Sequence, residues 1–221
     1  SDVCSSDLPF QLLLKPLVGA MAAGNCIVLK SSEFAPATSS LIKQIIEQTF
    51  DSKYILFIEG EGAVRVPELM NSITFDHVFF TGSTEVGRKI YQQAAAQLVP
   101  VTLELGGKSP CIIEEDADIQ IAAKRIALTK FSNVGQMCVA PDYLLVHDSQ
   151  KEKLVDALKD CIEKFFSANP QHSNNYGKII NEKQFNRIIS YFKDGNIIYG
   201  GAYEKETLFI APTLMMDVEG D

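Results

Sequence analysis

The sequence predicts an α/β fold built on a parallel sheet. Short apolar runs of four or five residues alternate with segments whose apolar residues recur at helical spacing. No internal repeat interrupts this alternation. Strands that alternate with helices favour right-handed β-α-β crossovers on a parallel sheet. The pattern restarts after Gly106 and Gly107, so we expect two α/β halves that meet there.

The first half contains four expected helices and four expected strands. Residues 9–23 are apolar at helical spacing and end at Gly24, and Pro36 opens a second helix that runs to Phe50. Two further helices are expected: a short one over residues 63–70, and one that the segment from Thr81 to Gly87 leads into and that runs through Gln97. The expected strands are residues 26–29, 54–58, 77–80 and 101–103.

The second half continues the same pattern with longer helices. Its expected helices are residues 118–132, 149–166 and 181–193, and the last two are amphipathic. A polar loop is expected over residues 167–178. The expected strands are residues 110–113, 143–146, 197–199 and 212–215.

Composition and charge disfavour several classes of partner. A net charge of −8 and a pI near 5.0 disfavour nucleic acids and anionic membranes, because both require a basic patch. No apolar run reaches the roughly 20 residues of a membrane helix. Five irregularly spaced cysteines without a C-x-x-C pair, and three distant histidines, disfavour a disulfide framework and a metal site. The cysteines favour a reducing, cytoplasmic location.

The segment from Gly82 to Lys89 follows an expected strand and opens a helix. Ligands of parallel α/β sheets bind beyond the carboxyl ends of the strands. The backbone N–H groups of this turn suit a phosphate or pyrophosphate, with Gly82, Ser83 and Gly87 as its candidate residues. The segment matches neither a G-x-G-x-x-G fingerprint nor a P-loop, so an ordinary serine-capped helix remains equally open.

Two other strand ends carry candidate ligand residues. Lys30 and Glu33 flank a strand-to-helix turn, where a cation and a carboxylate could hold ribose hydroxyls. From these two residues alone, the sequence favours a solvated ion pair over a ribose-binding site. Gly60 falls at the end of the next strand, on the same expected edge of the sheet.

Cys138 stands apart from the other cysteines because it lies on a glycine-containing loop, after Gly135 and Gln136. Three others fit small buried hydrophobic residues, since they lie in apolar strands or on an amphipathic helix: Cys26, Cys111 and Cys161. Glu104 ends a strand. A thiol and a carboxylate on separate loops can form and then hydrolyse a thioester, although a strand-end carboxylate without a catalytic role remains open.

Four segments resemble the aldehyde dehydrogenase superfamily, and they look closest to its class 3 or fatty-aldehyde branch. They are LKPLVGAMAAGNCIVLKSSE (Leu14 to Glu33), FDHVFFTGSTEVGRKI (Phe75 to Ile90), PVTLELGGKSP (Pro100 to Pro110) and GQMCVAPDY (Gly135 to Tyr143). The resemblance covers residues 9–218, about half of the family's chain. It implies a Rossmann-like NAD(P)-binding domain over residues 9–105 and a catalytic domain over residues 106–221, truncated at its C-terminus.

The resemblance implies oxidation of a small-molecule aldehyde to a carboxylic acid with NAD or NADP. In this scheme Cys138 forms a thiohemiacetal and then a thioester, and Glu104 activates the hydrolytic water. The matching positions place Lys30 and Glu33 at the adenosine ribose, and they place Gly82 and Ser83 beneath the pyrophosphate and Gly106 near the nicotinamide. The resemblance also implies a homodimer for the full-length protein.

The sequence departs from the family pattern in three places. Asp7 stands where the family has an asparagine that helps to bind the oxyanion, and Met137 stands where it often has threonine. The chain also ends before the family's Glu-Ile-Phe-Gly-Pro segment, and we expect truncated or foreign sequence at both ends, including residues 1–8. A catalytically inactive truncated dehydrogenase is therefore the main alternative. A cofactor-free cysteine hydrolase or acyltransferase would need a histidine near Cys138.

Overall fold

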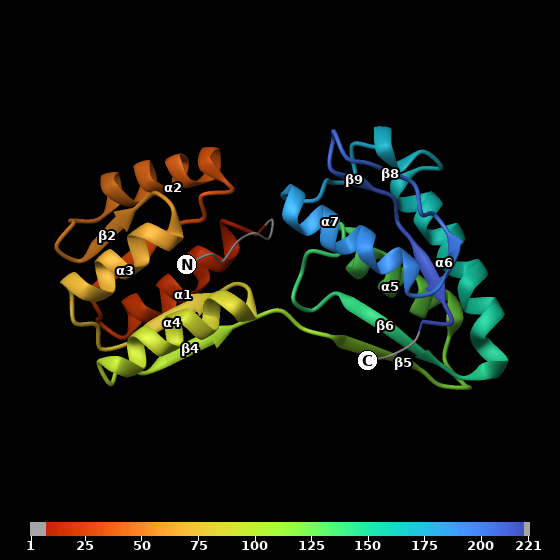
Figure 1. Cartoon of the computed structure of the whole chain (residues 1–221), viewed down its shortest axis with the longest axis horizontal. Helices are drawn as coiled ribbons and strands as arrows, with labels where there is room; N and C mark the ends of the chain where they lie inside the picture. Colours follow the sequence, from red (N-terminus) through yellow and green to blue (C-terminus); the bar gives the residue numbers. More distant parts are fainter. Residues whose placement is uncertain (1–7, 219–221) are drawn as a thin grey trace. The chain divides into compact units, whose positions relative to one another are not determined.

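The computed structural model describes residues 8–218, and Figure 1 shows the course of the chain. The chain divides into two compact units, Ser1–Gly106 and Gly107–Asp221. Asp7 and nearly all of the unusual N-terminal segment lie outside the described residues. The mixed α/β architecture and the parallel strand pairing predicted from the sequence are confirmed.

From residue 8 onward, the first unit alternates helices and strands. Its helices are α1 (Gln11–Ala22), α2 (Pro36–Thr49), α3 (Gly62–Ser72) and α4 (Thr84–Ala96). Its strands are β1 (Ile27–Lys30), β2 (Ile55–Ile58), β3 (Val78–Thr81) and β4 (Val101–Glu104).

Local sequence signals set the helix ends in this unit. Pro36 occupies the first turn of α2, where its missing N–H is not needed and its fixed φ suits a helix. The hydroxyl of Ser83 caps α4 by accepting the N–H of Val86 at 3.3 Å. After α1, Gly24 adopts a φ of 78°, which a residue with a Cβ rarely takes, and so the chain turns into β1.

Strand pairing in the first unit forms two separate parallel ladders. β1 pairs with β2, aligning Ile27 with Ile55, and β3 pairs with β4, aligning Val78 with Val101. The sequence predicted one continuous sheet, but over residues 8–218 no ladder joins β1 to β3. Figure 1 shows α2 beside β2 and α4 beside β4, and these pairs are also in contact.

The second unit combines one parallel ladder with two antiparallel ones. Its helices are α5 (Ile119–Phe131), α6 (Lys151–Phe166) and α7 (Glu182–Ser190), with short 3₁₀ turns η2 (Asp148–Gln150), η3 (Pro170–His172) and η4 (Tyr191–Lys193). β5 (Ser109–Ile113) pairs in parallel with β6 (Pro141–Val146). The antiparallel pairs are β7 (Asn196–Tyr199) with β10 (Leu214–Met216), and β8 (Tyr203–Glu204) with β9 (Phe209–Ile210).

The core of the second unit lies between α5, α6 and one face of the β5–β6 ladder. Ile113 of β5 is buried there together with Ala127 of α5 and Leu158 of α6. The opposite face of the ladder exposes three large apolar side chains: Ile112, Tyr143 and Leu145. The sequence missed β8 and β9 because each strand has only two residues, too few to show a period.

Gly87 illustrates how tightly α4 packs on its ladder. A Cβ at this position would lie 2.7 Å from Cδ2 of Leu105 and 3.4 Å from Cε1 of Phe80. Real Cβ atoms essentially never come within 3.0 Å of another atom, so with a larger residue either the side chain of Leu105 would shift or α4 would move away from the strands. Gly19 of α1 is different, because a Cβ there would meet no atom within 4 Å.

We predict that Gly87→Ala lowers the free energy of unfolding by about 1–3 kcal/mol, because the methyl group overpacks the contact between α4 and Leu105. Gly19→Ala is the matched control, and it should raise stability by about 0.5–1 kcal/mol, since alanine favours an unobstructed helix. Urea unfolding followed by helical circular dichroism measures both changes. Equal effects of the two substitutions would contradict the packing described for Gly87.

Candidate active site

Lys30 and Glu33 form a close ion pair at the carboxyl end of β1. Nζ of Lys30 lies 2.5 Å from Oε2 of Glu33, and the two side chains are 5% and 23% exposed. The other carboxylate oxygen, Oε1, accepts the backbone N–H of Gly62 at 3.1 Å. The interpretation of Lys30 and Glu33 as a solvated surface pair was therefore wrong. Lys30 is buried at the end of β1, and the backbone N–H of Gly62 binds the carboxylate of Glu33.

The surroundings of Glu33 favour its ionised form. Partial burial alone would raise the pKa of this carboxyl, but the hydrogen bond and charge of Lys30 and the backbone N–H of Gly62 outweigh burial and lower it from 4.5. Glu33 is therefore a fixed, ionised acceptor at the end of a parallel strand. Such a group can accept hydrogen bonds from the hydroxyls of a sugar.

A second polar group surrounds the end of β2, and sequence reasoning did not find it. Buried Ser31 and Ser39 share a hydrogen bond of 2.5 Å, and Oγ of Ser39 also donates to Oε1 of Glu59 at 3.2 Å. Lys43 binds the other oxygen of Glu59 at 3.0 Å. Gly60 follows directly with a φ of 117°, so the chain turns sharply here and a substitution would strain the backbone.

The paired ends of β3 and β4 bring together three residues singled out in the sequence. Gly82 donates its backbone N–H to the carbonyl oxygen of Glu104 at 2.9 Å. Ser83 follows as the N-cap of α4, so the unpaired N–H groups of that helix start beside the end of β4. The side chain of Glu104 is exposed at the last position of its strand. The edge thus combines a helix N-terminus with an accessible carboxylate.

Two further candidate glycines, Gly87 and Gly106, differ in their surroundings. Gly87 is buried one turn into α4, and the contact with Leu105 described above accounts for its small size. Gly106 is exposed, and a Cβ there would meet no atom within 4 Å. A role for either glycine in binding a cofactor stays a prediction.

Cys138 is exposed on the turn that joins α5 to β6 in the second unit. Its carbonyl oxygen accepts the hydroxyl of Ser109 at 3.3 Å, at the start of β5. A Cβ at Gly107 would lie 3.1 Å from the same oxygen, so glycine permits this close approach. The backbone of Cys138 is thereby held against the first residues of the unit, while its thiol remains accessible.

Gln136 ties the Cys138 loop to a distant segment. Its Oε1 accepts the N–H of Ile180 at 2.9 Å, and its Nε2 donates to the carbonyl of Lys178 at 3.1 Å. Val134 and Gly135 precede it with φ values of 55° and 78°, so two successive residues adopt the left-handed conformation. No local sequence signal reveals a partner more than 40 residues away, and this positioning role was missed.

Charged residues of the second unit meet beside the same loop. Asp142 of β6 binds Nζ of Lys108 at 3.3 Å and lies 3.8 Å from Nζ of Lys130. Burial lowers the pKa of Lys130, the charge of Lys108 lowers it further, and Asp142 opposes both effects. A Cβ at Gly135 would lie 3.3 Å from Cε of Lys130, so the Lys130 side chain lies against the backbone of the loop at Gly135.

The cysteines divide differently from the sequence prediction. Cys161 is buried in the core of the second unit as predicted, and Cys111 is half-buried, where burial raises the pKa of its thiol. Cys26 was predicted to be buried, but it is exposed. It immediately precedes β1, whose pairing with β2 begins at Ile27.

Within residues 8–218, no group of three or more histidine, cysteine, aspartate or glutamate side chains is arranged to hold a metal ion. In the same part of the chain, no helix combines the length and apolar composition needed to cross a membrane.

Glu104 belongs to the first unit and Cys138 to the second. In the first unit the candidate residues lie at or near strand ends, and in the second unit Cys138 lies on a loop.

Comparison with known families identifies the family of this chain. The model of the aldehyde dehydrogenase family matches residues 3–221. This chain belongs to that family. A curated relative, the 4,4'-diaponeurosporen-aldehyde dehydrogenase of Staphylococcus aureus, is 46% identical over 215 residues, which cover 96% of this chain and 46% of the relative. The dimeric NADP-preferring aldehyde dehydrogenase of Mus musculus is 42% identical, with the same coverage of each chain.

Solved aldehyde dehydrogenases share the fold. The substrate-bound Staphylococcus aureus enzyme superposes with a TM-score of 0.89 at 46% identity, and a Mycobacterium tuberculosis aldehyde dehydrogenase complexed with NAD⁺ gives 0.84 at 29% identity. Each comparison covers 96% of this chain and 46% of the solved one. The chain thus spans about half the length of the aldehyde dehydrogenases that it matches.

We predict that Glu33→Gln lowers the free energy of unfolding by about 1–3 kcal/mol at pH 7, because buried Lys30 loses its charged hydrogen-bond partner. The pKa of Glu33 is lowered on folding, so its contribution is complete above 4.5 and is lost as the pH falls through the folded-state pKa. The difference between wild type and variant should therefore shrink in acid. Chemical unfolding at a series of pH values measures it.

Glu68→Gln is the control for that prediction. Glu68 pairs with Arg65 at 2.9 Å, but both side chains are more than half exposed. An exposed pair contributes only about 0.2–1 kcal/mol, so this control should change stability little. Equal losses in the two variants would show that the Lys30–Glu33 pair is no stronger than a surface pair.

Proposed function

We propose that the full-length protein oxidises an aldehyde to a carboxylic acid with NAD or NADP as the hydride acceptor. The observation that carries this proposal is the exposed thiol of Cys138 on a tethered loop, in a chain of the aldehyde dehydrogenase family. A nucleophilic thiol must reach its substrate while its backbone stays fixed. The contacts of Ser109 and Gln136 support that combination.

Cys138 is the proposed nucleophile. Its thiolate adds to the aldehyde carbon, and the carbonyl oxygen takes up a proton to give a thiohemiacetal. A bound nicotinamide would accept the hydride from that carbon while the hydroxyl returns its proton to solvent, so that the thiohemiacetal becomes a thioester. Lys130, which lies under the preceding residues of the loop, adds positive charge to this part of the second unit.

Residues of the first unit are proposed to hold the dinucleotide. The ionised carboxylate of Glu33 is a suitable acceptor for ribose hydroxyls, and Lys30 lies beside it. Backbone N–H groups at the start of α4 suit a pyrophosphate. The remaining proposed contacts are Gly60, Gly82, Ser83, Gly87 and Gly106. The charge of Glu33 disfavours a 2′-phosphate and that of Lys30 offsets it, so NAD and NADP both remain in the proposal.

Glu104 is the proposed general base for release of the product. Its exposed carboxylate would take a proton from water as the water oxygen attacks the thioester carbon. The carbon–sulfur bond then breaks, the acid leaves, and the thiolate of Cys138 is restored. By the same family relationship, we propose that the full-length protein forms a homodimer.

A catalytically inactive fragment is the second candidate. It is favoured by Asp7, which stands where the family resemblance implies an asparagine that helps to bind the oxyanion. Loss of one oxyanion donor costs roughly 10²–10³ in rate. Comparing turnover by the 221-residue chain and by the full-length protein separates the two. A cofactor-free hydrolase would instead cleave esters and give no NADH or NADPH.

We predict that Cys138→Ala in the full-length protein reduces aldehyde-dependent NADH or NADPH formation by at least about a thousandfold, because no other group replaces the nucleophile. Cys26→Ala is the matched control, since Cys26 is also exposed but lies outside the proposed chemistry. It should retain activity. Full turnover by the Cys138 variant would remove this residue from the mechanism.

We predict that Glu104→Gln slows hydrolysis of the thioester more than its formation. A rapid burst of about one NADH or NADPH per active site should persist, while steady turnover falls by roughly 10²–10⁴, the usual contribution of a general base. Stopped-flow absorbance separates the two phases. If the burst disappeared with the steady rate, the carboxylate would act before thioester formation.

A further inference from the structure

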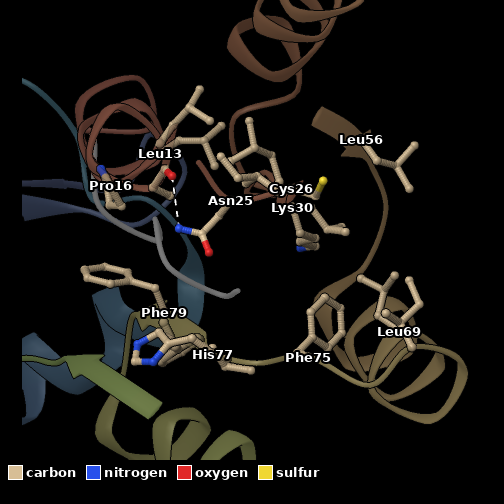
Figure 2. Close-up of a pocket in the computed structure, with 18 of the residues that line it drawn as sticks. Leu13, Pro16, Asn25, Cys26, Lys30, Leu56, Leu69, Phe75, His77 and Phe79 are labelled. Carbon is tan, nitrogen blue, oxygen red and sulfur yellow. Dashed lines mark hydrogen bonds between the residues drawn. The ribbon is translucent and has the colours of Figure 1, made fainter. Parts of the chain in front are cut away.

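Buried polar residues gather at one place in the first unit, around the carboxyl ends of β1 and β2. They are Lys30, Ser31, Ser32 and Ser39, each at most 7% exposed, and no other lysine or serine among residues 8–218 is buried. Figure 2 shows one of them, Lys30, in the same view as Leu56 of β2. Burying a polar group costs free energy unless it is hydrogen-bonded, so these side chains depend on partners in the same place.

Two of these serines form a relay that ends on Glu59. The hydroxyl oxygens of Ser31 and Ser39 lie 2.5 Å apart, and Oγ of Ser39 donates to Oε1 of Glu59 at 3.2 Å. A serine hydroxyl has one proton to donate, so the proton between the two serines must come from Ser31. The relay therefore runs in one direction, from Ser31 through Ser39 to the carboxylate of Glu59.

Lys43 binds the other oxygen of the same carboxylate. Its Nζ lies 3.0 Å from Oε2 of Glu59, and the hydrogen bond and charge of Glu59 raise the pKa of this lysine. Both side chains are 38% exposed, and an ion pair at the surface contributes little to stability. Removal of Glu59 would therefore matter chiefly for the two buried serines, which would lose their acceptor.

Two carboxylates connect the turns that follow β1 and β2. Glu33 follows β1, and its Oε1 accepts the N–H of Gly62, the first residue of α3. Glu59 follows β2, and its Oε1 accepts the hydroxyl of Ser39 in α2. Each carboxylate thus binds the helix that follows the other strand. These reciprocal bonds fix the two turns to each other.

The chain around Glu33 is restrained on both sides. Before it, the backbone N–H of Ser31 donates to the carbonyl of Ile58 at 3.4 Å, while its hydroxyl enters the relay. After it, the N–H of Phe34 donates to Oγ of Ser32 at 3.2 Å. A side chain that binds a ligand must lose conformational freedom, and a turn that is already fixed reduces that cost.

A turn with only a structural role would not need these groups. Apolar side chains of similar size would fill the same places without the cost of burying two hydroxyls beside a carboxylate. A fully paired polar network makes its surroundings rigid and unique. At the carboxyl end of a parallel strand, where ligands of α/β sheets bind, such rigidity serves the group that meets the ligand. That group is Glu33.

We propose that Glu59 is a positioning residue for nucleotide binding. Through the relay, it holds the turn on which Glu33 presents its carboxylate to the hydroxyls of the adenosine ribose. Glu59 itself makes no contact with the nucleotide in this scheme. The inference rests on the proposed function, because it takes Glu33 as the acceptor of the ribose hydroxyls. It concerns affinity for the nucleotide and leaves the chemistry at Cys138 unchanged.

Calorimetric titration of the full-length protein with ADP tests this role, because ADP carries the adenosine ribose and the pyrophosphate but no nicotinamide. Glu59→Ala should raise the Kd about tenfold, since Ser39 loses its acceptor. Glu59→Gln should bind within about threefold of wild type, because its amide oxygen can still accept the hydroxyl. Lys43→Ala is the matched control. It removes the ion pair but keeps the relay, so it should bind ADP as wild type does.

Ser39→Ala breaks the relay in its middle and leaves Glu59 paired with Lys43. It should weaken ADP binding about as much as Glu59→Ala does, so it remains a test if that variant fails to fold. In steady-state kinetics, both variants should raise the KM for NAD about tenfold and change kcat by less than about twofold, because the relay acts on nucleotide affinity. A loss of folded protein would instead lower the apparent kcat and leave KM unchanged.

A ligand without ribose hydroxyls separates positioning from a general loosening of the unit. 2′,3′-Dideoxy-ADP cannot make the contact with Glu33, so its Kd should be nearly the same for wild type and Glu59→Ala. The difference of about tenfold expected with ADP should therefore disappear with this ligand.

Three results would overturn the proposal. The first is equal affinity of wild type and Glu59→Ala for ADP. The second is an equal loss of affinity for ADP and for 2′,3′-dideoxy-ADP, which would indicate loosening of the whole unit. The third is a loss in Glu59→Gln as large as in Glu59→Ala, which would exclude the hydrogen bond as the cause. Failure of the proposed function would look different, because full-length wild type would then form no NADH or NADPH with any aldehyde, whatever the ADP affinities of the variants.

Discussion

The parallel pairing of β3 with β4 is the interaction on which the candidate site of the first unit depends. Its register aligns Thr81 with Glu104, and the following bond joins Gly82 to the same glutamate. Because these bonds fix where both strands end, the cap of α4 at Ser83 and the carboxylate of Glu104 must lie at one edge. A slip of one residue would turn the side chain of Glu104 to the opposite face of the ladder.

Short-range chemistry explains what the sequence predicted well. Apolar runs bounded by turn residues located the four strands of the first unit, and Pro36 and Ser83 marked helix starts by mechanisms that need no tertiary context. Failures occurred where distant residues decide the outcome. Cys26 opens an apolar run, but it precedes the first paired residue of β1 and is exposed. The partner of Gln136 lies 44 residues further along the chain.

The two units position their polar groups by different means. In the first unit, the register of a ladder places Glu104 at the end of β4, and bonds from Lys30 and Gly62 place Glu33 three residues after β1. In the second unit, a turn with two left-handed residues presents Cys138, and side-chain bonds from Ser109 and Gln136 restrain it. Left-handed backbone is costly outside glycine, so Val134 persists in it only because surrounding contacts over-determine the turn.

The exposure of Cys26 has a consequence for handling the protein. Cys26 and Cys138 each present an accessible thiol, one in each unit. In air, oxygen can oxidise a thiol on one molecule and a thiol on another to a disulfide, and the two exposed sites among residues 8–218 allow linear or cyclic polymers as well as pairs. The apparent molecular mass of a purified sample would then depend on the reductant in the buffer, whatever the native assembly is.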